Sequence, residues 1–191
     1  MLRFDNIYCE FSKKFNLKKN DLIFPLFVDE NNNFQELSYL PGIFKISYDK
    51  IIQIVDEVID NGIESLILFG IPKLRDNRGQ SLIAKNGVVQ KSLQMIKSNF
   101  GSRITVITDV CVCQYNKTGH CGLLEKDKKV VNNDLTVELL SQIALSHARA
   151  GVDIVAPSSM MDGQVKKIRE ILDTNGYNKI KILSFSAKQS S

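Results

Sequence analysis

The chain has 191 residues, 43% of them hydrophobic and 24% charged, and 25 Lys and Arg against 21 Asp and Glu leave a net charge of +4. This composition is typical of one globular domain and excludes collagen-like, coiled-coil and wholly disordered chains. The charge is too small and scattered to indicate a nucleic-acid partner, and no apolar run is long enough to cross a membrane. The first residues lack the apolar segment of a secretion signal. We therefore expect a cytoplasmic protein with no membrane or nucleic-acid partner.

Strands and helices alternate in the predicted order of elements. Short apolar runs rich in Ile, Val and Leu indicate buried strands, and apolar residues repeated on one face indicate helices. The elements expected in chain order are strand 22–28, helix 49–61, strand 65–70, helix 88–98, strand 104–110, helix 134–150, strand 153–158, helix 163–175 and strand 180–187. Asp162 is the expected N-cap of the helix at 163–175.

This alternation predicts an α/β fold with a parallel sheet, and it leaves two architectures open. An open doubly wound sheet and a (β/α)8 barrel both begin with such units. No glycine-rich dinucleotide or phosphate-binding motif follows any strand, which weakens the open nucleotide-binding fold. A barrel needs eight strands and typically about 250 residues. Because only five strands are predicted, we expect either an open sheet or a barrel truncated after about five strands.

Chemically active side chains follow several of the predicted strands. In parallel α/β folds, the carboxyl ends of the strands carry the functional groups. Those ends hold Asp109 with Cys111 and Cys113, then Ser158, then Ser184, Ser186 and Lys188. The sequence therefore predicts a functional site at one end of the sheet.

Three of the four cysteines are close in sequence: Cys111, Cys113 and Cys121. Clustered thiols in a chain without a secretion signal more often bind metal or undergo redox chemistry than form disulfides. Three thiolates can bind Zn²⁺ and leave a fourth position for water or substrate. The alternative is three unligated cysteines near a turn. His120 is a possible fourth ligand, but as the neighbour of Cys121 it is better read as a loop or substrate-contact residue.

Lys188 directly follows the last predicted strand. A lysine in a desolvated pocket at a strand end can lose its proton near neutral pH and attack a carbonyl group as an amine. On position alone, a surface lysine is the simpler interpretation. His147 falls in the middle of a predicted helix and is expected to be packed or at the surface.

Motifs spread over nearly the whole chain resemble the porphobilinogen synthase family, also called delta-aminolevulinic acid dehydratase. Those nearest the predicted site are 108–113 (TDVCVC), 119–123 (GHCGL), 151–158 (GVDIVAPS), 160–163 (MMDG) and 186–188 (SAK). The others are 21–27 (DLIFPLF), 40–42 (LPG), 68–72 (LFGIP) and 144–148 (ALSHA). Gln114, Asn116, Lys117 and Ser159 depart from the commoner residues of the family.

The resemblance implies a (β/α)8 barrel preceded by an N-terminal arm, here residues 1–20 and then 21–191 for the barrel part. It implies condensation of two 5-aminolevulinate molecules to porphobilinogen, with loss of water, in tetrapyrrole and haem biosynthesis. Members usually assemble into homo-octamers. The zinc-using branch binds its catalytic Zn²⁺ through three cysteines, and Cys111, Cys113 and Cys121 all match them.

The resemblance also implies roles for single residues. Lys188 matches the earlier of two Schiff-base lysines, Asp109 an active-site aspartate and Ser158 a serine of the substrate pocket. The second lysine, the basic residues of the active-site lid and the ligands of any second, activating metal ion would lie beyond Ser191, as would the last barrel strands. We therefore expect the chain to lack the C-terminal part of the family.

Two other functions remain open from the residues. One is a class I aldolase-like barrel enzyme that uses Lys188 without a metal, which the clustered cysteines disfavour. The other is an inactive fragment or decayed gene product that retains zinc binding, which would bind zinc without turning over 5-aminolevulinate.

Overall fold

The computed structural model describes residues 16–38, 40–76, 80–125 and 130–187. Its strands are β1 (Ile23–Asp29), β2 (Gln35–Glu36), β3 (Phe44–Ile46), β4 (Ser65–Ile71), β5 (Thr105–Val110), β6 (Ile154–Pro157) and β7 (Lys181–Ile182). Its α-helices are α2 (Ile51–Asp60), α3 (Val88–Phe100), α4 (Asn133–Arg149) and α5 (Gln164–Thr174). Short 3-10 helices span Lys19–Asp21, Tyr48–Lys50 and Gln80–Leu82. No helix of the described part is long and apolar enough to cross a membrane.

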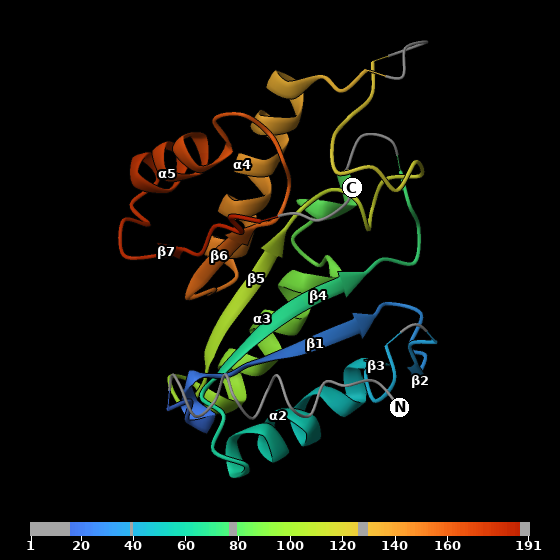
Figure 1. Ribbon diagram of the computed structural model, residues 1–191, viewed down its shortest axis with the longest axis vertical. Helices are drawn as coiled ribbons and strands as arrows, with labels where there is room; N and C mark the ends of the chain where they lie inside the picture. Colours follow the sequence, from blue (N-terminus) through green and yellow to red (C-terminus); the bar gives the residue numbers. More distant parts are fainter. Residues whose placement is uncertain (1–15, 39, 77–79, 126–129, 188–191) are drawn as a thin grey trace.

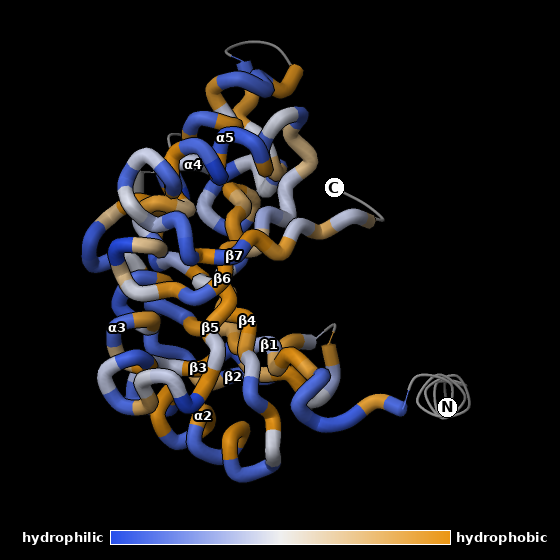
Figure 2. Tube along the Cα trace, turned by 90° about the vertical axis from the view of Figure 1, so that its left-hand side faces the viewer, coloured by the Kyte–Doolittle hydropathy of each residue, from blue (hydrophilic) through white to orange (hydrophobic). Residues whose placement is uncertain are grey.

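All these strands belong to one sheet in the order β2-β3-β1-β4-β5-β6-β7. The pairs from β1 through β7 are parallel, and β2 alone runs antiparallel to its neighbour β3. β1 and β4 pair over seven residues, from Ile23 opposite Ser65 to Asp29 opposite Ile71. Within the described residues, the four α-helices all lie on one side of the sheet (Figures 1 and 2).

Side chains that alternate along the strands form two apolar layers, because successive residues point to opposite faces. Leu66, Leu68 and Val106 belong to the main core that packs against the helices. On the other face, Ile67, Ile107 and Ala156 form a second cluster. A sheet buried by helices on one face and by its own side chains on the other is the arrangement inside a (β/α)8 barrel.

The predicted succession of five strands and four helices is confirmed, with ends that shift by a few residues. Three expectations are wrong in detail. The sequence did not indicate β2 and β3. The last strand is the two residues of β7 rather than 180–187, although the amide groups of Leu183 and Phe185 still donate to carbonyl groups of β6 and its end. The N-cap of α5 is Gly163, with a positive φ of 82°, and not Asp162.

β7 lies at one end of the strand order, and the residues after it are poorly covered. Leu183 is 41% exposed and Phe185 is 46% exposed. The predicted N-terminal arm, residues 1–20, lies mostly outside the described residues.

Candidate metal centre and substrate pocket

Asp109 and Ser158 meet at the carboxyl ends of two neighbouring strands. Asp109 is on β5, and Ser158 comes directly after β6, which pairs with β5. The Ser158 hydroxyl donates a hydrogen bond of 2.5 Å to Oδ1 of Asp109. The Ser158 amide also donates to the carbonyl group of Val110, at 3.4 Å. Both side chains are half-buried, so a small molecule at this end of the sheet can reach them.

The three predicted thiols lie together just beyond Asp109. The sulfur atoms of Cys111, Cys113 and Cys121 all lie within 4.8 Å of one another, and those of Cys111 and Cys113 are 3.4 Å apart. Thiolates bound to one tetrahedral Zn²⁺ at about 2.3 Å are about 3.8 Å apart, so only small shifts separate these sulfur atoms from a zinc site. Cys111 and Cys121 are buried and Cys113 is half-buried, which leaves one open side. The residues fit a three-thiolate metal ion with a free position.

Without a metal ion, this environment keeps the Cys111 and Cys113 thiols protonated. Hydrogen bonds with Cys113 and Cys121, burial and the nearby charge of Asp109 all raise the pKa of Cys111. The hydrogen bond with Cys111 lowers the pKa of Cys113, but Cys121, burial and Asp109 outweigh it and raise that pKa to about 11. A bound cation reverses this balance because a coordinating thiol is deprotonated. Metal binding here must therefore release protons.

Sequence reasoning missed the residues that hold the cysteine loop in place. The Ser159 hydroxyl donates to the carbonyl group of Cys121 at 2.8 Å. The Leu123 amide donates to Oγ1 of Thr136 at 2.9 Å. His120 accepts the amide of Gly122 at Nδ1, at 3.0 Å, and is not one of the grouped ligands in the described part. No local signal marks Ser159 or Thr136, because each contacts backbone that is distant in sequence.

Tyr115 packs the turn after Cys113 against β4, where Gly70 makes room for it. A Cβ atom at Gly70 would lie 2.4 Å from the Tyr115 hydroxyl and 2.6 Å from a methyl group of Val88. Only glycine fits so close an approach. Burial, followed by the charges of Asp109 and Glu30, raises the pKa of Tyr115 well above its usual value, so its hydroxyl stays protonated.

The structure tests the prediction for His147 but not the one for Lys188. Lys188 lies outside the described residues, so its role stays a prediction, and Ser184 and Ser186 before it are exposed. His147 is packed rather than at the surface, with 2% of its area exposed. Its Nδ1 lies 2.9 Å from the Thr108 hydroxyl, and burial lowers its pKa to about 3.

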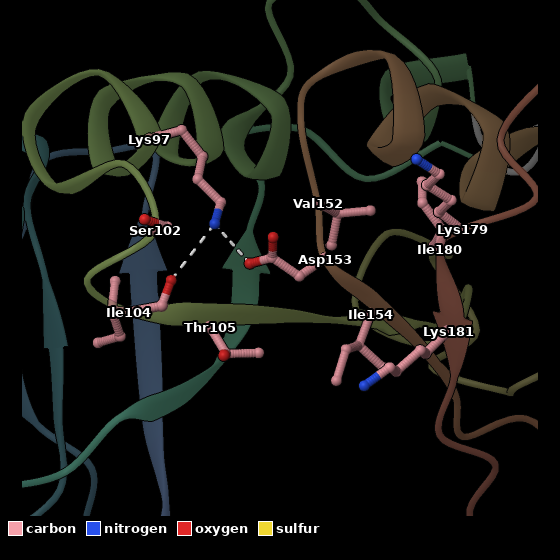
Figure 3. A pocket seen from close by; sticks show the side chains of 10 residues that line it. All are labelled: Lys97, Ser102, Ile104, Thr105, Val152, Asp153, Ile154, Lys179, Ile180 and Lys181. Atoms are coloured by element: carbon pink, nitrogen blue, oxygen red, sulfur yellow. Dashed lines mark hydrogen bonds and ion pairs between the residues drawn. The ribbon is translucent and has the colours of Figure 1, made fainter.

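A cavity lies at the opposite end of β5 and β6 from the three cysteines. It has a volume of about 400 Å³ and is lined by residues that include Lys97, Asp153 and Lys181 (Figure 3). Lys97 reaches from α3 to Asp153, whose Oδ2 lies 2.5 Å from the lysine Nζ and also accepts the amide of Val106. The hydrogen bonds of Lys97 and Asp153 join α3 to the start of β5 and to the residue before β6, which is a structural role.

The fold and the site define the class: an α/β barrel chain whose strand ends bring a carboxylate and a potential three-thiol metal centre together. A family model described as delta-aminolevulinic acid dehydratase matches residues 1–191. The chain belongs to this family. The predicted barrel fold is thereby confirmed, and a solved structure agrees with it over the full chain. That structure is a delta-aminolevulinic acid dehydratase (porphobilinogen synthase) from Toxoplasma gondii in complex with porphobilinogen, with a TM-score of 0.87 at 29% identity.

Relatives in sequence carry the same description. The delta-aminolevulinic acid dehydratase of Methanothermus sociabilis is 46% identical over 180 residues, which cover 94% of this chain and 55% of that protein. The one from Ruminiclostridium josui is 39% identical over 191 residues, which cover all of this chain and 92% of that sequence. The chain covers 56% of the Toxoplasma structure. It thus spans about half the length of the curated relatives it matches, the Ruminiclostridium sequence excepted.

Proposed function

We propose that this chain contributes the first part of a zinc-dependent porphobilinogen synthase, which condenses two 5-aminolevulinate molecules to porphobilinogen. One observation carries the proposal: three thiols within 4.8 Å of one another lie at the same strand ends as the Asp109–Ser158 pair. Family membership and the porphobilinogen bound in the Toxoplasma structure support the substrate class. The remaining barrel strands would complete the site.

Cys111, Cys113 and Cys121 would hold the metal ion. A Zn²⁺ ion bound there supplies a Lewis acid that polarises an oxygen atom of the substrate. Three sulfur ligands favour zinc over magnesium or calcium, which prefer oxygen. The half-buried side of Cys113 leaves the approach through which substrate would reach the open position.

Asp109 and Ser158 would orient the substrate and move protons beside the metal centre. The Asp109 carboxylate can accept a proton from a substrate ammonium group or carbon atom, since it is half-buried at the strand end. The Ser158 hydroxyl would hold Oδ1 of this carboxylate in place.

Lys188 would hold one substrate covalently. Its unprotonated amine would add to the ketone carbon, and the carbonyl oxygen would leave as water with the two amine protons; one proton from solvent would then give the protonated C=N bond to the lysine. This iminium group makes the adjacent carbon more acidic and so favours carbon–carbon bond formation. The assignment rests on the family resemblance of 186–188, and the second lysine of the family would come from the remaining barrel strands.

We also propose a cytoplasmic homo-oligomer, an octamer in its complete form. The three free thiols support the compartment, because cysteines persist unpaired where glutathione and thioredoxin keep them reduced. The oligomer rests on the family resemblance. A second, activating metal ion would need ligands outside this chain.

The test is to purify the protein from its own source in whatever assembly it forms, measure its intact mass and metal content, and assay porphobilinogen formation. The proposal expects zinc, turnover of 5-aminolevulinate and loss of activity on chelation that added Zn²⁺ restores. A Cys113→Ala variant should lose both zinc and activity. Activity that survives chelation would instead favour a metal-free lysine enzyme. Zinc binding without turnover would favour an inactive remnant.

A further inference from the structure

We infer that Ser159, supported by Gln164, is a positioning residue that sets where the Cys121 sulfur lies in the metal centre. The inference rests on the metal centre of the proposed function and adds residues that the ligand set does not contain. Ser159 follows β6 and is 5% exposed. Its hydroxyl bonds the backbone of Cys121 and not a sulfur atom.

The contact joins Ser159 to the ligand's own backbone. Its hydroxyl donates to the carbonyl oxygen of Cys121 at 2.8 Å, across 38 residues of sequence. The carbonyl oxygen of Ser159 in turn accepts the side-chain amide of Gln164 at 3.0 Å. Gln164 is the first residue of α5 and is 8% exposed. Cys121 is therefore tied through Ser159 to two regular elements, the end of β6 and the start of α5.

The contact between Ser159 and Cys121 affects the site because the adjacent residue, Ser158, also belongs to it. Ser158 bonds Asp109, and Ser159, the next residue, bonds the Cys121 backbone. One strand end thus holds the carboxylate and the third thiol at a fixed separation. Two consecutive hydroxyls in this arrangement couple the substrate side of the site to its metal side.

The loop has other anchors, and they act on its later residues. The Leu123 amide is bonded to Thr136, and the side-chain amide of Asn116 donates to the Gly122 carbonyl at 3.5 Å. Removing the Ser159 hydroxyl therefore leaves the loop attached and removes the hydrogen bond to the Cys121 carbonyl oxygen. We expect the Cys121 sulfur to be less well oriented as a result. Changes to residues that orient a metal ligand typically lower metal affinity by about 10- to 100-fold.

The experiment compares Ser159→Ala with the unsubstituted full chain, using Co²⁺ as a spectroscopic probe and Zn²⁺ in competition. We expect metal affinity to fall by about 10- to 100-fold and the thiolate–cobalt absorption bands to shift. Ser159→Thr, which retains the hydroxyl, should restore the bands. Gln164→Met should weaken binding by a smaller factor. Ser92→Ala is the matched control, because it also removes a fully buried hydroxyl, bonded to Val88 within α3, and should change nothing at the metal.

Hydrogen exchange of the metal-free chain gives an independent readout. The peptide containing Cys121–Leu123 should exchange faster in Ser159→Ala and not in Ser92→Ala. Unchanged exchange, or Co²⁺ affinity and spectrum equal to those of the unsubstituted chain, would overturn the inference. If the unsubstituted chain binds neither ion, the proposed metal centre fails, and the exchange result alone then decides whether Ser159 positions Cys121.

Discussion

At both ends of β5 and β6, a carboxylate forms a hydrogen bond that connects the two strands. The two ends differ in the groups that surround this carboxylate. At the amino ends, the Asp153 carboxylate accepts the Val106 amide and pairs with Lys97. At the carboxyl ends, the Asp109 carboxylate accepts the Ser158 hydroxyl. The first carboxylate is neutralised by a cation from the covering helix. The second lies beside the three thiols, and the pKa values of two of them, Cys111 and Cys113, are raised.

This difference separates stability from function along one pair of strands. A neutralised carboxylate bonded to backbone stabilises the strands and leaves little capacity for a ligand. The Asp109 carboxylate is half-buried, accepts a hydroxyl and lies beside three thiols, so a metal ion or a substrate can approach it. The contrast agrees with the rule that barrel proteins carry their chemistry at the carboxyl ends of the strands and their stability at the amino ends.

Replacing Cys113 by alanine should have the largest effect at the functional end. One of three sulfur ligands is lost, so we expect Zn²⁺ affinity to fall by more than about 100-fold, which exceeds the change expected when an outer-shell residue is lost. Stability of the metal-free chain should change little because Cys113 is only half-buried. Competition titration with a zinc chelator measures the first quantity and thermal melting the second. Retained zinc affinity would show that the thiols do not form the site.

Lowering the pH should destabilise the fold through His147 of α4, which contacts Thr108 of β5. Burial lowers its pKa from 6.5 to about 3 in the folded state. Below about pH 6.5 the unfolded chain takes up a proton that the folded chain does not, so the contribution of His147 is full above that pH and declines as pH falls toward 3. Between pH 7 and 5 the expected loss is about 2 kcal/mol.

The control is His147→Gln, whose amide can still bond Thr108 but does not titrate. Urea unfolding at several pH values should show stability falling more steeply with acid in the unsubstituted chain than in the variant. Parallel pH dependence of the two would mean that His147 is protonated in the folded state.

The core elements were predictable because their signals are local. Apolar runs and one-faced repeats located five strands and four helices within a few residues. β3 was not predicted because it has only three residues, and one of them, Phe44, is 39% exposed. It therefore shows neither an apolar run nor an alternation of apolar and polar residues. Gly163 replaced Asp162 as the N-cap because the Asp162 peptide bonds the side chain of Asn133 instead. That contact comes from another helix and leaves no mark in the sequence around Asp162.

The same distinction between local and long-range signals applies to the candidate site. Cys111, Cys113 and Asp109 were indicated by their place after a strand, and the structure brings them together with Cys121 and Ser158. The partners that fix the loop were not indicated. A serine hydroxyl that bonds a carbonyl group 38 residues away looks like any other loop serine in sequence. Candidate ligands can therefore be predicted from spacing, whereas the contacts that support them require the folded chain.

Replacing Lys97 by methionine should weaken the amino end alone. The change retains most of the aliphatic stem and removes the bonds from Nζ to Asp153 and to the carbonyl group of Ile104. Hydrogen bonds to charged groups contribute about 1.5 to 3 kcal/mol, so unfolding in urea should show a loss near the lower value because the pair is partly exposed. Zinc affinity should stay within about twofold.

Lys181→Met is the matched control for that variant. Lys181 lines the same cavity and makes no ion pair in the described part of the chain. Its replacement should leave stability within about 0.5 kcal/mol, as is usual for surface substitutions. If both lysine variants lost zinc affinity, the two ends of the strands would be coupled, and the division between stability and function would be wrong.

The smallest expected effect concerns Asn132, which links the cysteine loop to α4. Its side-chain oxygen caps the helix by accepting the Leu135 amide at 3.0 Å, while its own amide donates to the Leu123 carbonyl at 2.8 Å. Asn132→Ala should cost about 1 kcal/mol of stability, the usual value of an N-cap. Asn132→Asp keeps the cap and should lose much less. Zinc affinity should fall by less than about threefold in both variants, because the backbone bond to Leu123 remains. A larger fall confined to Asn132→Ala would show that the helix cap, as well as Ser159, orients the thiols.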